Sequence, residues 1–551
     1  MSSELKKDIF QICSRQTTLT DTTECYNDIN LICEEIKNQI ELNDVSLVDS
    51  LVREYIKEIE TDLSGGSFLS SKSQVAYLTA IDCLCLLYAN GLSGEVLDCF
   101  TRIMLPLPGK WVWIEGIDQT GSSRARWTAQ NSFLATTEHI FEVLNHFLRE
   151  LKSKGIEYPM TRLLIELMVS YSFLDFPWVT ERSYALSNML LCDVINISHI
   201  DSKIYEEILL ETIKPLIVKA RAHVHKAVSD EGRQKIRITK LGVGSVNYNS
   251  EVSDPERFEW SEARLDILGI YRFVLERITL DQIISNWSFL IPSLLNILDE
   301  PDPAMKLQAV KLIDILLHRI SSLDPSLMKK SGVGYIFWES LLSCTTFLPP
   351  LTDSRLSIPL IKCSIRALVV LSKLIEPNDV SKRSLLLDNI MRDAILKGLT
   401  YSGSQDVKVA YCLVISSDLL IKNMGTYSLK HLQSMLGIIG SVMCDPFCTA
   451  SLPLLNSTIE LSISLIQYCW PRIGNHQYEL LRFIAMAWKC VKEDIMARNG
   501  SDDELVKTKK NIEKLMLFLA DAVGVKKIKT DTDQLKLIKD GYYEELFSRI
   551  I

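Results

Sequence analysis

Cysteine is the side chain in this sequence whose pairing could signal a metal site. Cys83 lies close to Cys85, and Cys444 lies close to Cys448. A structural zinc site needs four ligands, and neither pair has a second pair or two histidines nearby to complete the set. We therefore expect no metal site. Most of the 14 cysteines are expected to be reduced and buried as small apolar side chains.

Catalytic and cofactor-binding motifs are equally scarce. Gly109-Lys110 is followed by Trp111 rather than by the Ser or Thr of a phosphate-binding loop. His223 and His225 would point in different directions on a helix and have no evident third ligand. Hydrolase, zinc-protease and kinase signatures are absent from the sequence. The sequence therefore predicts no catalytic, cofactor-binding or metal-binding residues, and a protein that is not an enzyme.

Composition limits the remaining classes. The 551 residues are 47% hydrophobic and 23% charged, as in a folded protein, and exceed the size of one ordinary core. The formal net charge of −9 disfavours direct nucleic-acid binding. The charged start and the interruption of the apolar stretch 75–92 by Asp82 indicate neither a secretory signal nor a membrane span. We expect a cytoplasmic and nuclear protein.

Apolar residues recur at helical spacing through the carboxyl-terminal half. A helix is predicted over 280–298, bent at Pro292, with Ile284 on its apolar face. Asp302 and Pro303 then have the residue types of an N-cap and a first helical position. The next helix has a clean apolar face, made of Met305, Ala309, Leu312, Ile313, Leu316 and Ile320. Two helices with so short a connection form an antiparallel hairpin.

The same pattern returns about one hundred residues later, which indicates hairpins of about fifty residues. Leu298 aligns with Leu399, and a polar break again precedes an Asp, Asp406. A looser copy surrounds Asp445. Repeated helical hairpins predict an all-α fold, a HEAT/armadillo-like α-solenoid of stacked helical hairpins.

Three regions are predicted from the regularity of this pattern. Residues 1–226 form an irregular amino-terminal helical region, and residues 259–551 form the HEAT-like repeat region. Residues 227–258 are polar and rich in Gly, Ser and Asn, which is typical of a loop or linker. Ile236 and Ile238 alternate with polar residues there, so a short β-hairpin is an alternative for part of it.

A short run near the carboxyl end carries a family resemblance. The sequence from Tyr468 to Ile473, Tyr-Cys-Trp-Pro-Arg-Ile, is followed by the apolar helical run 478–488. Together these resemble the carboxyl-terminal signature of the second Tel-interacting protein family (Tti-two). The segment 291–306 is similar to the central helical block of that family, and the segment 176–180 is a weaker echo.

The resemblance implies a non-catalytic scaffold in the Triple-T (TTT) cochaperone complex. The implied partners are the larger Tel and Tti subunits and, through them, heat-shock protein 90 and its RuvB-like ATPase adaptor. The implied role is maturation of the phosphatidylinositol-3-kinase-related kinases (PIKKs), which serve growth signalling, telomere maintenance and DNA-damage responses. Two alternatives stay open: another solenoid adaptor such as a transport receptor, and an enzyme with an unrecognised helical active site.

Trp470, Pro471 and Arg472 are the candidate site residues. Pro471 lacks an N–H and disfavours helix at Trp470, so we expect a helix boundary at this point. Trp470 is expected to bury a large apolar area, and Trp470→Ala to cost about 3 to 5 kcal/mol of stability or to reduce complex recovery. Arg472 could donate to exposed carbonyls or to a partner carboxylate. A corner between repeats and a partner contact are the two interpretations.

Overall fold

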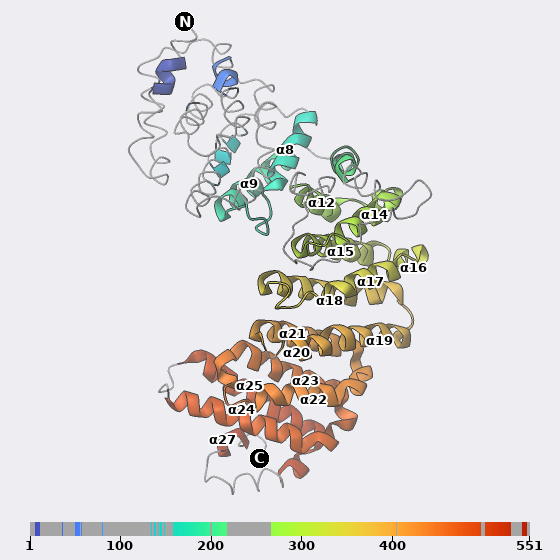
Figure 1. Cartoon of the computed structure of the whole chain (residues 1–551), viewed down its shortest axis with the longest axis vertical. Helices are drawn as coiled ribbons and strands as arrows, with labels where there is room; N and C mark the ends of the chain where they lie inside the picture. The colour runs from blue at the N-terminus through green and yellow to red at the C-terminus, as the bar shows by residue number, and fades with distance from the viewer. Residues whose placement is uncertain are drawn as a thin grey trace, which may run out of the picture. The chain divides into compact units, whose positions relative to one another are not determined.

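The chain is helical throughout the part that the structure describes. The computed structural model describes residues 158–198, 201–217, 266–403, 405–497, 502–529 and 543–547, with short pieces and single residues between 6 and 148. These residues contain helices and no strand (Figure 1). The predicted all-α fold class is confirmed. The chain divides into two compact units, Met1–Ser285 and Asn286–Ile551.

The first unit contains a helical hairpin against which a further helix packs. Its hairpin is α8 (Tyr158–Ser170) with α9 (Glu181–Ser198). After α10 (Lys203–Glu207) and the π-helical η4 (Ile208–Ile213) comes α12 (Asp266–Arg277), which packs on α8 and η4. The apolar residues of α12 at helical spacing are buried, as is the residue just after its end; they are Ile267, Leu268, Tyr271, Val274, Leu275 and Ile278.

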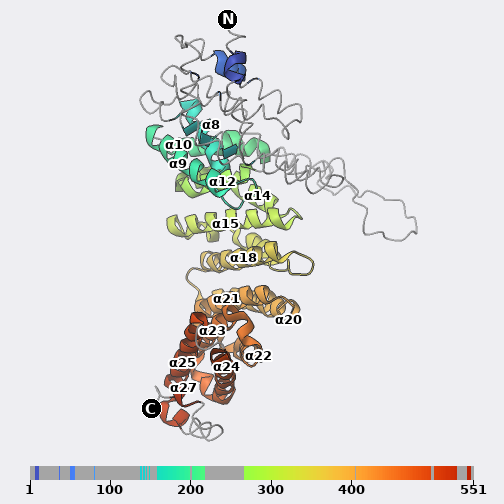
Figure 2. The same cartoon turned by 90° about the vertical axis from the view of Figure 1, so that its left-hand side faces the viewer.

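Five helices of the second unit lie side by side in chain order and form what we call the first row. They are α15 (Pro303–Leu323), α18 (Ser354–Ile375), α21 (Val407–Met424), α23 (Leu452–Ile473) and α25 (Asp503–Val523). Each packs against the next, and the two views show them stacked along the unit (Figures 1 and 2). Their starts are separated by about fifty residues, which confirms the predicted hairpin length.

The second row of this unit supplies the other helix of each hairpin. It consists of α14 (Trp287–Leu298), α17 (Gly334–Cys344), the run α19 (Val380–Asn389), η5 (Ile390–Leu396) and α20 (Lys397–Tyr401), then α22 (Leu432–Met443) and α24 (Gln477–Ala497). Each member packs against a first-row helix, and the apolar core lies between the two rows. The unit is therefore a stack of helical hairpins, as the sequence predicts.

Aspartate begins four of the five first-row helices in the described chain. Asp302 accepts a hydrogen bond from the backbone N–H of Ala304 at 3.0 Å, and Asp406 accepts one from Lys408 at 2.8 Å. Asp353 and Asp502 cap their helices in the same way. Each carboxylate satisfies an N–H that lacks a partner within the helix. The predicted caps at 302 and 406 are confirmed.

The first predicted hairpin differs from the structure at its beginning. The helix expected over 280–298 is two helices, α13 (Leu280–Ser285) and α14, separated at Asn286, and Pro292 lies inside α14. Ile284 is 49% exposed rather than buried. The reason is that α13 turns Gln282 inward instead: its side chain accepts from the Thr279 N–H and donates to the carbonyl of Ser202.

Several predictions concern residues outside the described part. They are the limits of the loop or linker 227–258, the alternative hairpin through Ile236 and Ile238, the pair Cys83 and Cys85, and the pair His223 and His225. These stay predictions.

Candidate partner-binding surfaces

The candidate residues Trp470, Pro471 and Arg472 lie at a kink in α23. The helix continues to Ile473, but Cys469 has non-helical angles, φ −104° and ψ 16°. Pro471 provides no N–H for the helical hydrogen bond, which explains a kink at this position. The range of α23 thus comprises two helical segments joined at this kink, and the helix boundary predicted at Trp470 is confirmed at Cys469, one residue earlier.

All three candidate side chains point to solvent. Trp470 is 62% exposed, and Pro471 and Arg472 are exposed as well. The expectation that Trp470 buries a large apolar area is wrong. Because a kinked helix still fixes the direction of each side chain, burial of Cys469 and Ile473 on one side turns Trp470 to the other.

Small side chains, rather than Trp470, pack on the buried side of the kink. Cys469 is fully buried, and its Sγ lies 3.2 Å from the Oγ of Ser428 in η6 (Gly425–His431). Burial raises the pKa of the Cys469 thiol, so the thiol stays protonated and acts as a packing group. Beyond the turn η8 (Gly474–His476), Tyr478 is 65% exposed near the start of α24. Aromatic residues and arginine are enriched at protein interfaces, so the exposure of these residues keeps the kink as a candidate partner-binding surface.

The tryptophan of the weaker family echo has the opposite environment. Trp178 is 1% exposed and lies between α8 and α9. Its ring stacks on Phe176 with centroids 4.6 Å apart, and its Nε1 donates to the carbonyl of Ser170 at 3.1 Å. This side chain holds the hairpin together and offers nothing to a partner.

A cavity of about 370 Å³ opens beside this hairpin, between the α8–α9 connection and α12. The Arg272 guanidinium lies 4.3 Å from the Phe173 ring centroid and 3.1 Å from the Asp175 carboxylate. Arg277 stacks on Phe273 at 3.8 Å and pairs with Glu276 at 3.3 Å. The two arginines that line the cavity are thus already paired with carboxylates and aromatic rings of the same lining. The lining contains no nucleophile next to a base, the arrangement that covalent catalysis needs.

Titratable side chains in the second unit also have structural partners. His431 Nε2 lies 2.5 Å from Asp388 Oδ1, which joins η6 to α19, and burial lowers the pKa of His431. Burial raises the pKa of Cys448 to about 12, so that thiol is unreactive. Among the residues that the structure describes, no three His, Cys, Asp or Glu side chains form a metal-binding group.

Exposed apolar side chains also occur on or next to the loops that lead into the first row, where sequence reasoning placed no site. Leu351, Tyr401 and Phe447 are 97%, 78% and 77% exposed. Consecutive loops touch, because Ser402 donates to the carbonyl of Pro349 at 3.1 Å. The signal in the sequence is a large apolar residue beside each Pro- or Gly-containing break.

None of the described helices is by itself long and apolar enough to span a bilayer. One pair of segments bent by 105°, Val407–Met443 with Cys448–Ala497, reaches that length and composition only when combined.

Comparison with solved structures finds karyopherins at low similarity. Kap121p bound to the extreme C-terminus of the protein phosphatase Cdc14p is 12% identical, with a TM-score of 0.41, over 97% of this chain and 55% of that chain. Kap95p in a structure with RanGDP is 10% identical, with a TM-score of 0.43, over 100% and 60%.

Comparison of sequences finds closer relatives. TEL2-interacting protein 2 of Saccharomyces cerevisiae is 25% identical over 249 residues, which are 43% of this chain and 59% of the yeast protein. The match thus spans less than two thirds of that relative. The model of the Tti2 family matches residues 164–450, a segment that includes the 176–180 and 291–306 motifs and ends before Trp470. Since this match covers more than half of the 551 residues, the chain belongs to the Tti2 family.

Proposed function

We propose that the protein is a non-catalytic scaffold subunit of the TTT cochaperone complex. The observation that carries this proposal is the family match over residues 164–450, supported by a yeast relative whose name states an interaction with TEL2. The fold agrees with the role, since stacked hairpins present long surfaces on which other chains dock. The candidate surfaces described above hold exposed aromatic and basic side chains rather than a reactive pair.

The proposed direct partners are the larger Tel and Tti subunits. Through them the protein would act with heat-shock protein 90 and its RuvB-like ATPase adaptor in the maturation and stability of PIKKs. This role would place it in the cytoplasm and the nucleus, where those kinases are made and used.

Native mass spectrometry of the tagged full-length protein, purified at low salt, tests the proposal. We expect two larger helical-repeat subunits in near-stoichiometric amounts, and lower steady-state levels of PIKKs after depletion of the protein. Recovery of the protein alone would contradict membership of the complex. Recovery with a small GTPase and its cargo would instead indicate a transport receptor.

A further inference from the structure

Positive charge is concentrated on three neighbouring first-row helices of this acidic protein. The chain carries a net charge of −9, yet α15, α18 and α21, counted with their capping aspartates, together contain nine Lys or Arg and five Asp. Helix α18 has four basic residues and no acidic one. A local charge of this sign within an acidic chain favours an acidic partner.

The basic residues of α18 form one exposed stripe. Arg355, Lys362, Arg366 and Lys373 follow one another at intervals of seven, four and seven residues, which places them on one face of the helix. Arg366 pairs with the buried carboxylate of Asp314 on α15. The other three form no ion pair with any residue that the structure describes.

An apolar ridge runs along the neighbouring helix, α21. Its members recur every fourth residue: Val407, Tyr411, Ile415 and Leu419 are 53%, 37%, 36% and 36% exposed. Twelve residues of helix span about 18 Å, so the ridge extends over about three helical turns. Residues four apart form the ridges that fit between side chains of another helix.

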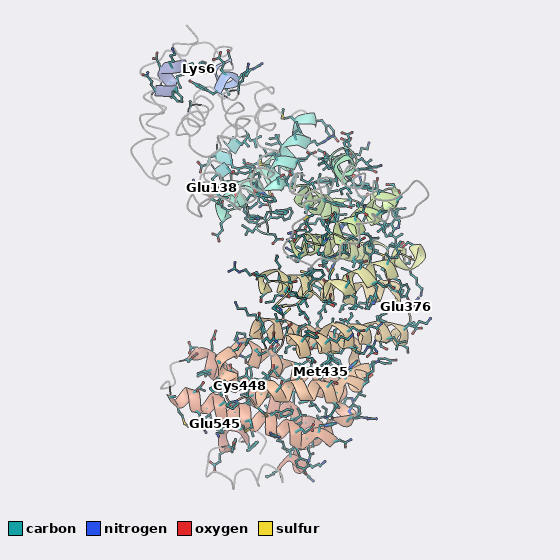
Figure 3. All side chains as sticks on the ribbon, in the orientation of Figure 1. Lys6, Glu138, Glu376, Met435, Cys448 and Glu545 are labelled. Carbon is teal, nitrogen blue, oxygen red and sulfur yellow. The ribbon has the colours of Figure 1, made fainter. Side chains whose placement is uncertain are left out.

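The stripe and the ridge belong to one surface, which we call the α18–α21 face. The two helices are neighbours in both views, and the Sγ of Cys412 donates to the carbonyl of Ile358 at 3.7 Å across their contact (Figures 1 and 2). Burial raises the pKa of Cys412 to about 11, and the positive charge of Lys362 opposes that rise. Lys362 therefore lies close to the helix that carries the ridge. The side chains of this part of the second unit are drawn in Figure 3.

We propose that the α18–α21 face binds an acidic amphipathic helix of a partner protein. The apolar side of that helix would pack along Val407, Tyr411, Ile415 and Leu419, and its carboxylates would face Arg355, Lys362 and Lys373. Helices with apolar residues at this spacing dock into such surfaces. The inference goes beyond membership of a complex, because it names the chemistry of one bound segment whatever the partner is.

Other occupants fit the face less well. A second copy of the chain, meeting it through the same face, would bring two basic stripes together. A nucleic acid would pair its phosphates with the stripe and leave most of the apolar ridge unused.

Photo-crosslinking in the full-length protein identifies the occupant. Tyr411 is replaced by p-benzoylphenylalanine, with the same replacement of Tyr335, 51% exposed on α17, as the control. We expect Tyr411 alone to give a crosslinked peptide with several Asp or Glu and apolar residues three or four apart. A crosslink to a second copy, to nucleic acid or to a peptide without this pattern, or no specific crosslink, overturns the proposal.

Affinity for a labelled synthetic copy of the crosslinked peptide tests the contacts. Lys362→Glu and Ile415→Ser should each weaken binding at least tenfold, about 1.4 kcal/mol, and added NaCl should weaken it further. Lys510→Glu on α25 and Ile336→Ser on α17 are matched exposed controls and should leave affinity unchanged. Equal loss in the controls, with unchanged circular dichroism, overturns the proposal.

The same samples separate this inference from the proposed function. Peptide binding without recovery of the two larger subunits would contradict only the proposed TTT membership. Recovery of both subunits by a protein whose face binds no acidic helix would contradict only the docking inference.

Discussion

Trp178 and Trp470 each lie next to a proline, yet one is in the core and the other is on the surface. Trp178 is 1% exposed, stacked on Phe176 and hydrogen-bonded to the carbonyl of Ser170, whereas Trp470 is 62% exposed. Trp178 lies in a connection between helices, where the chain can fold the ring back under α8. Trp470 lies in a kinked helix, which fixes its direction outward. Backbone context, rather than residue type, decides whether an aromatic residue next to proline stabilises the fold or is available to a partner.

The largest expected effect is on the buried side of this comparison. Trp178→Ala removes a fully buried ring and should lower the free energy of unfolding by about 3 to 5 kcal/mol. Urea unfolding followed by circular dichroism measures the change. A loss below about 1 kcal/mol would mean that the hairpin repacks to fill the space left by the removed ring.

Trp178→Phe separates the ring from its hydrogen bond. Phenylalanine keeps an aromatic ring against Phe176 but cannot donate to the buried carbonyl of Ser170. An unsatisfied buried polar group costs about 1 to 3 kcal/mol, so we expect a smaller loss than for alanine. Equal losses in the two variants would show that the hydrogen bond, and not the ring, holds the hairpin.

A glycine beside Phe176, the ring on which Trp178 stacks, tests how tightly this region is packed. A Cβ at Gly269 would lie 3.0 Å from Phe176 and 3.3 Å from Phe173. Gly269→Ala gains about 1 kcal/mol of helix propensity but should lose about 1 to 3 kcal/mol to overpacking, for a net loss of up to about 2 kcal/mol. Gly437→Ala in α22, where a Cβ meets no atom within 4 Å, is the matched control and should stabilise by up to about 1 kcal/mol. Thermal unfolding of both variants shows whether the two signs differ.

Local rules of sequence predict much of this fold. Asp302 and Asp406 were recognisable as caps because capping depends on the next few residues alone. The apolar face of α15 can be predicted because its apolar residues recur at helical spacing, and the structure shows that all of them are buried.

The candidate surfaces were harder to predict, since exposure depends on neighbouring hairpins. The α21 ridge has the spacing of a core face, so periodicity alone cannot show that it is exposed. The predicted burial of Trp470 is wrong for a related reason, because the kink at Cys469 sets which side of α23 is buried. The signal of the α18–α21 face in the sequence is the run of four basic residues in α18 with no acidic residue among them.

The smallest stability effect is expected at the exposed tryptophan. Trp470→Ala should change the free energy of unfolding by less than about 0.5 kcal/mol, because a 62% exposed side chain leaves no closed cavity when it is removed.

If the kink binds a partner, as we predict, recovery of the larger subunits falls in Trp470→Ala and in Arg472→Ala. Trp178→Phe, a moderately destabilised variant that leaves the kink intact, is the control for losses caused by instability. Unchanged recovery in both kink variants would mean that the exposed aromatic has no partner in this complex, and a stability loss above about 2 kcal/mol would mean that Trp470 is packed in solution. Only reduced recovery with an unchanged free energy of unfolding is consistent with a partner contact. If Trp470 instead held two repeats together, its replacement would lower the free energy of unfolding as well.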